Sequence, residues 1–417
     1  MQRIATYIII ALLAASHASP AFGESLDWPR WRGPRGDGVA ENDGLPVRWS
    51  RTENVSWSVE LPGWGTSSPV VVGDRVYVTS QVEEDGKKSL LTLCYRKRDG
   101  RELWRHDFGF GYDQKTHETS NLACITPAAD EDGVVAGFGN AEFARYSRDG
   151  KLEWVTRLVP IMKEASTAWG FGASPIIEPD AVLLPYEHHG DPCFLLGIDK
   201  RTGEFAWKKA RPPGPTYATP LVVENAGGRI IVATGKHRLT AFDARTREQL
   251  WQYGEGEGAY NGEIVGSPTF GDGMVFGQLW RKDNIHALRL NENGAPPTSL
   301  WVSEKPGPEE PSLLYYRGLL YSQMDNGVIV CFDARTGEEL YRERLGGNCT
   351  ASPVAGGGHV YLCNHDGTTF VLRAGRKFEL LATNELGERF LASPAITGRQ
   401  LILRTNSHLY CVGRADR

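Results

Sequence analysis

The sequence lacks several features that mark common classes of protein. No long amphipathic helical pattern is visible, so we expect little helical structure. Its seven cysteines include no adjacent pair and no Cys-x-x-Cys-His run, which excludes covalent haem attachment. No cysteine precedes Cys94, which excludes lipid anchoring on a cysteine at the mature N-terminus.

The sequence also lacks a strong excess of charge of one sign and a long apolar run. The formal net charge is −5, and it becomes −6 when Arg3 is removed, so electrostatics gives no reason to expect nucleic acid or anionic lipid as a partner. The apolar run from Tyr7 to Ala15 is too short to span a bilayer comfortably. Followed by Ala21-Phe22-Gly23, it predicts a signal peptide at residues 1–23 and an exported protein, periplasmic or secreted, without a membrane span after cleavage. A retained N-terminal anchor is the alternative.

The sequence contains instead a block that recurs eight times. Each copy has an apolar segment after a Ser-Pro or similar pair, then two further apolar segments, a turn and a bulky residue. Residues 172–207 and 217–251 show the block clearly. Four short strands per unit and a period of about 40 to 50 residues are typical of a β-propeller. We predict an all-β fold, an eight-bladed β-propeller of four-stranded blades; seven blades with a stray hairpin are the alternative.

Three columns of residues define the repeat. Glycine six places after a small third-strand residue suits a turn with positive φ, but Arg247 takes this place in the fourth unit. Because the tryptophans are periodic, we expect them to pack between blades. The units open at Pro69, Pro127, Pro175, Pro220, Pro268, Pro311, Pro353 and Pro394. The bulky residues are Trp104, Trp154, Trp207, Trp251, Trp301, Tyr341 and Leu381.

The eighth unit is one strand short, because only six residues follow Cys411. Asn54–Leu61 is interpreted as an isolated outer strand ahead of the first unit. We predict that this N-terminal strand supplies the outer strand of the last blade and closes the ring without open edges. Residues 53–417 then form a single propeller domain.

Residues 24–52, between the signal peptide and the propeller, are too aromatic for a free linker. Their run Trp28–Gly38 is rich in tryptophan, arginine, proline and glycine. We expect an N-terminal clasp segment that lies across the ring with arginines stacked on tryptophans. A partner-binding arm is the alternative.

The alternating direction of the strands divides the connections between two faces. Blade-to-blade loops share one face with the loops between second and third strands, and these are the longer loops. Long loops on a rigid scaffold usually carry binding, so this loop-rich face and its central funnel are the predicted site. Its ligand-binding candidates are His117, Glu118, Asn121, Trp169, Glu187, His188, Tyr217, Glu263, Trp280 and Arg281.

These residue types suit several kinds of chemistry. Histidines and carboxylates act as acids, bases or metal ligands, while aromatic and arginine side chains hold planar or sugar-like ligands. Glu187 and His188 are adjacent and point to opposite faces of an extended strand, so we predict no metal site. For Trp169 and Trp280, packing of the loops is favoured over stacking on a ligand. For His117-Glu118, a hydrogen-bonding pair within the loop is favoured over a functional role. No catalytic residue is assigned.

An odd number of cysteines is unusual in an exported protein. Cys94, Cys331 and Cys411 share a column with alanine and glycine, which favours small buried thiols. Cys349 and Cys363 flank one glycine-rich hairpin, so they are the candidate disulfide.

The run Phe242–Trp251, with its counterparts Asp199–Trp207 and Asp333–Tyr341, resembles the tryptophan-docking repeat of the PQQ-like β-propeller family. The resemblance covers roughly Asn54–Arg414 and implies the fold. The family includes the quinoprotein alcohol dehydrogenases and the propeller lipoprotein of the outer-membrane barrel assembly machinery. With its opening Trp28–Gly38 segment, the chain looks more like exported PQQ-like repeat proteins.

Two departures limit what this resemblance implies about function. The quinoprotein dehydrogenases hold PQQ against a disulfide between adjacent cysteines, over calcium bound by Glu, Asn and Asp, and this sequence has no adjacent cysteines. The assembly lipoprotein is lipidated on a cysteine, and none precedes Cys94. No functional residue is carried over from either relative.

Three hypotheses remain. The favoured one is a monomeric, non-catalytic binding or scaffold protein that takes a protein or extracellular ligand on its loop-rich face, with cell-envelope assembly as one such role. The second is an oxidoreductase of diverged site that depends on PQQ with calcium, or on a metal. The third is a carbohydrate-binding or carbohydrate-active propeller using Trp169 and Trp280. Hydrolysis would need the carboxylates of Glu187 and Glu263 about 5 to 10 Å apart.

Overall fold

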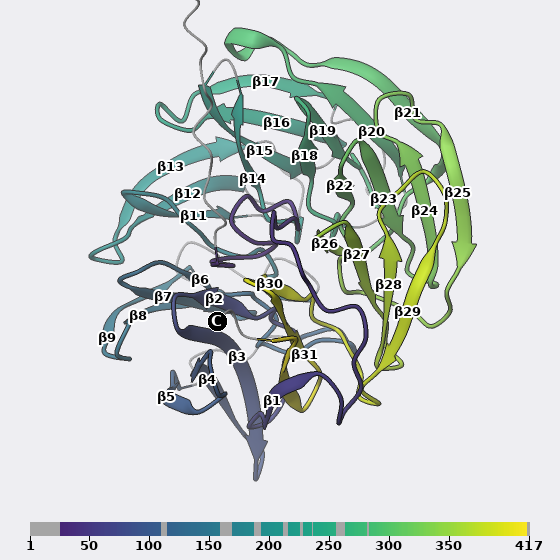
Figure 1. Cartoon of the computed structure of the whole chain (residues 1–417). Coiled ribbons are helices and arrows are strands. Elements are labelled where there is room, and N and C mark those ends of the chain that lie inside the picture. The colour runs from purple at the N-terminus through teal and green to yellow at the C-terminus, as the bar shows by residue number, and fades with distance from the viewer. Residues whose placement is uncertain are drawn as a thin grey trace, which may run out of the picture.

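The computed structural model describes residues 26–109, 115–158, 169–186, 193–211, 216–225, 228–235, 237–255, 263–281 and 283–414. They form eight four-stranded antiparallel sheets around a central axis (Figure 1), with the 3-10 turn η2 (Glu292–Gly294) as their helical element. The predicted all-β, eight-bladed propeller is confirmed. None of the described residues belongs to a helix long and apolar enough to cross a membrane. The predicted signal peptide lies outside the described residues.

Seven blades each contain four consecutive strands. In each of these blades the first strand lies nearest the axis and the fourth lies outermost. The first three blades are β2 (Val70–Val72), β3 (Arg75–Glu84), β4 (Lys87–Arg96) and β5 (Glu102–Asp107); β6 (Ala128–Ala129), β7 (Gly133–Phe138), β8 (Glu142–Ser147) and β9 (Leu152–Arg157); and β10 (Ile176–Ile177), β11 (Ala181–Tyr186), β12 (Cys193–Asp199) and β13 (Phe205–Arg211). The next two are β14 (Leu221–Asn225), β15 (Gly228–Gly235), β16 (Arg238–Asp243) and β17 (Gln249–Tyr253); and β18 (Thr269–Gly271), β19 (Met274–Gly277), β20 (Asn284–Arg289) and β21 (Thr298–Pro306). The sixth and seventh are β22 (Leu314–Tyr316), β23 (Leu319–Gln323), β24 (Val328–Asp333) and β25 (Glu339–Arg344); and β26 (Val354–Gly356), β27 (His359–Cys363), β28 (Thr368–Arg373) and β29 (Leu380–Glu385).

The last blade is closed by the N-terminal strand, as the sequence predicts. β30 (Ala395–Thr397), β31 (Gln400–Arg404) and β32 (His408–Val412) come from the C-terminus, and β1 (Val55–Glu60) pairs antiparallel with β32. Trp57 of β1 lies opposite Cys411, the register that Trp104 has with Cys94 in the first blade. The closing strand therefore supplies both the missing edge and the missing tryptophan.

The spacing between small and bulky residues is less constant in the structure than in the sequence. Trp154 lies opposite Arg145 rather than Ala144, and Val371 lies opposite Ala382 rather than Leu381. Each third-to-fourth-strand pair contains a register shift, and in these two blades the hairpin before the shift differs by one residue. The bulge adds one residue in each of these blades, so the difference in turn length changes which residues lie opposite each other.

Outer-strand tryptophans dock on the following blade. Four indole Nε1 atoms donate to backbone carbonyls in the next third-to-fourth-strand turn: Trp57 to Lys97 (2.7 Å), Trp104 to Arg148 (3.1 Å), Trp154 to Lys200 (2.9 Å) and Trp301 to Ala334 (3.0 Å). The turn glycines beneath these rings are Gly100, Gly150, Gly203 and Gly337, with φ between 70° and 85°. A Cβ there would meet the indole at 2.7–2.8 Å, so both backbone conformation and space require glycine.

Arg247, the exception in the glycine column, adopts the same positive φ of 63°. Its guanidinium carbon lies 4.7 Å from the ring centroid of Trp207. The fourth blade therefore replaces the close glycine contact with a cation–π contact.

A closed ring of eight hydrogen bonds joins the inner strands around the axis. In each blade the backbone N–H of a buried serine or threonine donates to the hydroxyl of its counterpart in the next blade, at 2.8–3.2 Å. The members in order are Ser68, Thr126, Ser174, Thr219, Ser267, Ser312, Ser352 and Ser393, which donates back to Ser68. We call this set the hydroxyl ring. Its sixth member follows Pro311 instead of preceding a proline, so the residue equivalent to the opening prolines there is Leu313, two places after the predicted one.

The first part of the N-terminal segment lies inside the ring (Figure 1, purple). Its later part runs across the seventh blade, where Pro46 O accepts from the Tyr361 hydroxyl and Trp49 N–H donates to Asn384. Trp28 forms an antiparallel bridge with Val71 of β2, and Val39 forms a parallel bridge with Ala355 of β26. Between them, a guanidinium N–H of the buried Arg32 donates to Leu313 O. Residues 28–40, which we call the plug, therefore pack against inner strands on different sides of the axis.

Candidate functional site

A cavity of about 360 Å³ opens at the axis on the loop-rich face. All eight segments that lead into an inner strand contribute to its wall, and Arg281 joins them from the β19–β20 loop. Its volume lies within the range of small-molecule sites. Trp31 of the plug also lines the cavity, and its indole N–H donates to Ser267 Oγ at 3.3 Å, so the plug reaches the hydroxyl ring.

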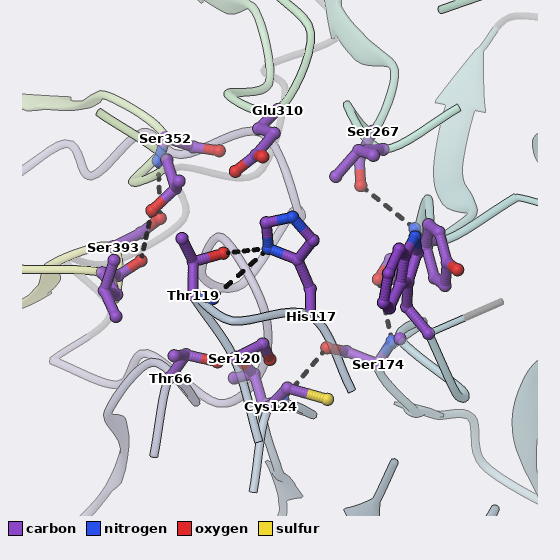
Figure 2. A pocket seen from close by; sticks show the side chains of 18 of the residues that line it. Thr66, His117, Thr119, Ser120, Cys124, Ser174, Ser267, Glu310, Ser352 and Ser393 are labelled. Carbon is purple, nitrogen blue, oxygen red and sulfur yellow. Dashed lines mark hydrogen bonds between the residues drawn. The ribbon is translucent and has the colours of Figure 1, made fainter. Parts of the chain in front are cut away.

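Aromatic side chains form one side of this axial cavity. The ring of His117 meets Trp169 edge-on, with centroids 5.2 Å apart, and Lys115 Nζ lies 4.6 Å from the Trp169 ring centroid. The His117 Nδ1 atom accepts the backbone N–H of Thr119 at 3.3 Å and lies 2.7 Å from the Thr119 hydroxyl. These contacts within the β5–β6 loop fix the imidazole, which points into the cavity in Figure 2. Phe171 completes this side.

Acidic residues lie on another side. The backbone N–H groups of Glu309 and Glu310 donate to the carboxylate of Asp325 at 2.7 and 2.9 Å, which holds the β21–β22 loop in place. The Glu309 carboxylate forms an ion pair with Arg281. The Glu310 carboxyl points into the cavity (Figure 2), and burial, followed by the charge of Asp325, raises its pKa above the ordinary range.

Tyr217 and Glu263 are brought together by a short parallel bridge between Thr216 and Ile264. The Tyr217 N–H donates to Ile264 O at 2.8 Å, and the Thr216 hydroxyl donates to the same carbonyl at 3.0 Å. Glu263 is 8% exposed. Because the bridge joins the segments that enter the fourth and fifth blades, two sequence-distant side chains share one wall of the cavity.

Cys124 is a cavity-lining thiol. Its Sγ lies 3.5 Å from Phe171 O, and burial raises the pKa of the thiol to about 11. Because the thiolate is the effective nucleophile, a raised pKa disfavours a nucleophilic role for Cys124.

Comparison with known proteins agrees with the repeat and the ring. A family model described as outer membrane protein assembly factor BamB, of the PQQ-like repeat type, matches residues 39–172, 189–290 and 277–416. These matches cover most of the chain.

The chain belongs to the PQQ-like repeat β-propeller family.

Solved structures of this family and fold superpose over most of the chain. BamB from Moraxella catarrhalis is 16% identical, with a TM-score of 0.58 over 86% of this chain and 98% of that one. Quinohemoprotein alcohol dehydrogenase from Comamonas testosteroni is 12% identical, with a TM-score of 0.69 over 94% of this chain and 82% of that one. Identities this low establish the fold alone.

A curated relative is tetrathionate hydrolase from Acidithiobacillus ferrooxidans. It is 28% identical over 270 residues, which make up 59% of this chain and 50% of that protein. The chain therefore matches half the length of this relative.

Within this PQQ-like propeller, the structure places five of the predicted site residues on the axial cavity: His117, Trp169, Tyr217, Glu263 and Arg281. They come from four inter-blade segments and one loop within a blade.

Three other candidates lie elsewhere. Asn121 is buried and shapes the loop, since its side chain donates to Trp64 O and accepts the N–H of Ala123. Glu118 is exposed outside the cavity lining. Trp280 stacks on His237 with centroids 3.6 Å apart, also away from the lining. Glu187 and His188 lie outside the described residues. The carboxylate separation that hydrolysis would need, between Glu187 and Glu263, therefore stays a prediction.

Sequence reasoning missed Glu309, Glu310 and Trp31. The two glutamates stand directly before Pro311-Ser312, so their place at the end of an inter-blade loop was a usable signal. Trp31 belongs to a segment expected to lie across the ring, and no local pattern indicates that it enters the axial cavity.

The predicted cysteine pair is not joined in the structure, where Cys349 and Cys363 are both free thiols. Cys349 Sγ donates to Met324 O at 2.9 Å, and Cys363 Sγ lies 3.4 Å from the Thr369 hydroxyl. Across the described part of the chain, no three His, Cys, Asp or Glu side chains form a group that could hold a metal ion.

Proposed function

We propose that this protein is an exported, non-catalytic member of the PQQ-like family that binds its ligand at the axial cavity of the loop-rich face. The observation that carries the proposal is the cavity itself. Residues from every inter-blade segment line one space of about 360 Å³, above a hydroxyl ring that holds those segments in fixed positions. A rigid ring that presents irregular loops is a common arrangement for recognition.

The fold family raises the question of PQQ, which carries three carboxylates. The cavity lining contains Glu263, Glu309 and Glu310, and its guanidinium, Arg281, already forms an ion pair with Glu309. Carboxylates facing carboxylates repel one another in a site of reduced dielectric. The described residues therefore do not fit PQQ, and we favour binding over quinone-dependent oxidation.

The test compares a loop-face variant with a matched variant elsewhere. In Trp169→Ala/Arg281→Ala, an exposed aromatic and a cation are removed at the cavity. In Arg98→Ala/Phe205→Ala, the same types are removed from the β4–β5 turn on the opposite face and from the outer strand β13. We expect proteins cross-linked to the wild type from the native cell envelope to be retained by the second variant and lost by the first. Equal retention by both variants would contradict the proposal.

A second experiment tests the oxidoreductase alternative directly. The purified protein is titrated with PQQ, with and without calcium, while absorbance and heat are recorded. We expect no saturable change. Saturable binding together with dye-linked oxidation of an alcohol or sugar would replace the binding function with a catalytic one.

A further inference from the structure

The charges around the axial cavity indicate which chemical class of ligand it takes. Three carboxylates and one guanidinium belong to the lining, and the guanidinium of Arg281 is engaged with Glu309. Among the hydrogen bonds and ion pairs of the described residues, none involves the carboxylate of Glu310. Burial and the charge of Asp325 outweigh the nearby charge of Arg281 on the pKa of Glu310. This acidic side chain thus faces the cavity without an ion-pair partner of its own.

Glu310 is held in this position by its backbone. The N–H groups of Glu309 and Glu310 both bind the Asp325 carboxylate, so the loop cannot turn Glu310 outwards without breaking these two bonds. The charge of Asp325 also makes the cavity more negative. Burial of Glu310 costs free energy while its carboxylate is ionised and unpaired, and a cation at hydrogen-bond distance would offset that cost.

The opposite side of the cavity suits a cation for an independent reason. Trp169 is 37% exposed, and its ring already attracts the ammonium of Lys115 at 4.6 Å. An indole face binds ammonium and guanidinium groups through its quadrupole. Phe171, Tyr217 and Leu391 add apolar surface to the same lining.

We infer that the axial cavity binds its ligand through an ammonium or guanidinium group that pairs with Glu310, while apolar parts of the ligand rest on the aromatic side. This inference deepens the proposed function and rests on it. Two sources share this chemistry: a small free amine, and a lysine or arginine side chain presented by a partner protein.

The experiment is isothermal titration calorimetry of the full-length protein with four probes. Benzylamine represents a free amine, and the blocked dipeptide N-acetyl-glycyl-arginine amide represents a protein side chain. Benzyl alcohol and benzoate are the neutral and anionic matches of benzylamine. We expect at least one cationic probe to bind at least tenfold more tightly than benzyl alcohol or benzoate, and the better cation identifies the source.

Two variants locate the binding. Glu310→Gln keeps the shape of the side chain and removes its charge, and we expect it to weaken the cationic probe by about tenfold, the size of one charge-assisted hydrogen bond. Glu343→Gln, on the exposed outer strand β25, is the control and should bind like the wild type. An unchanged affinity in Glu310→Gln would overturn the inference.

The remaining outcomes separate this inference from the proposed function. If benzoate or benzyl alcohol binds as tightly as the cations, and Trp169→Ala weakens it, the cavity is a binding site but the cation preference is wrong. If none of the four probes binds at millimolar concentration, the inference is wrong. The cross-linking comparison then decides whether the loop-rich face binds a partner at all.

Discussion

The hydroxyl ring and the axial cavity above it are built on opposite principles. Every blade contributes a serine or threonine to the ring, and each makes the same bond to its neighbour. Six members of the ring also line the cavity, but the rest of its wall has no such regularity, because one segment brings His117, another Trp169 and another Glu310. Repetition thus belongs to the part that holds the ring closed, and variation to the part that meets a ligand.

The difference has a physical origin. A buried backbone N–H at the axis must find an acceptor, and in an eightfold arrangement the same solution serves every blade. Loops that face an open cavity satisfy their polar groups with water or local contacts, so they are free to differ. Substitutions in the hydroxyl ring or the plug should therefore reduce stability, whereas substitutions in the loops that wall the cavity should change binding.

The largest loss of stability is expected from a substitution in the plug. Trp28→Ala removes an indole that is 1% exposed, and truncation of such a side chain costs about 3–5 kcal/mol of the free energy of unfolding. Trp169→Ala, at the cavity, should change it by less than about 0.5 kcal/mol. Urea unfolding of both variants measures the contrast. Equal losses of unfolding free energy would mean that the plug and the cavity wall contribute equally to stability.

The next effect concerns the contacts between blades. Gly203→Ala introduces a side chain at φ 76°, 2.8 Å from the Trp154 ring, and should cost about 2–4 kcal/mol from backbone strain and overpacking together. Gly86→Ala is the matched control, because Gly86 has φ 72° and no atom within 4 Å of the added Cβ. We expect about 1–2 kcal/mol there. Thermal unfolding that shows the same loss in both would remove the role assigned to the tryptophan contact.

Loss of one hydrogen bond of the hydroxyl ring should measurably reduce the free energy of unfolding. Ser352→Ala leaves the buried N–H of Ser312 without its acceptor, which costs about 1–3 kcal/mol. Ser352→Thr retains a hydroxyl, as Thr126 and Thr219 do in the ring, and should recover most of the loss. Ser58→Ala, on the exposed face of β1, should be neutral. Loss of stability in the threonine variant equal to that in the alanine variant would argue against the hydrogen bond as the cause.

The smallest effect concerns the closing seam and depends on pH. The Glu388 carboxylate binds five side chains around the last blade: Arg51, Thr405, Ser407, His408 and Tyr410. Although burial opposes ionisation, the hydrogen bonds, led by Ser407 and Thr405, lower its pKa from 4.5 to about 2. A carboxyl with a depressed folded-state pKa stabilises the fold above its unfolded pKa, and this stabilisation is lost as the pH falls from about 4.5 towards 2.

Glu388→Gln should therefore lower the melting temperature at pH 7 and reduce its pH dependence between about pH 4.5 and 2. Melting curves of the wild type and the variant across this window test both points. Glu343→Gln serves as the exposed control. Parallel pH profiles for wild type and Glu388→Gln would show that the carboxylate does not act at the seam.

Much of the fold was predictable because its determinants are local and repeated. Strand order, blade number and closure by β1 all follow from apolar segments separated by turns, and the structure confirms each. The small errors, at Trp154 and Leu381, arise where a turn differs by one residue and shifts the register of the two strands. Register depends on the pairing of two strands, which the sequence of one strand does not reveal.

The candidate site was only partly predictable. Long loops pointed to the face on which the cavity opens, and His117 and Arg281, which line it, were named because polar residues in such loops stand out. Trp280 was misplaced, since an aromatic residue in a loop packs on whichever neighbour is nearest, here His237. Glu310 was missed because its importance lies in a carboxylate that makes no hydrogen bond or ion pair with the described residues around it, and only the tertiary structure shows this.

The amino-acid sequence alone determined an eight-bladed, N-terminally closed propeller of the PQQ-like type, because the same short pattern of strands and turns recurs along the chain. Only the tertiary structure decided how the ring is held and where its cavity lies. The hydroxyl ring joins residues 40 to 58 positions apart, and 325 apart at its closing bond. The plug contacts β2, β26 and, through Trp31, Ser267 at the fifth blade. Contacts between distant segments depend on how the closed ring positions them, and no local pattern encodes that arrangement.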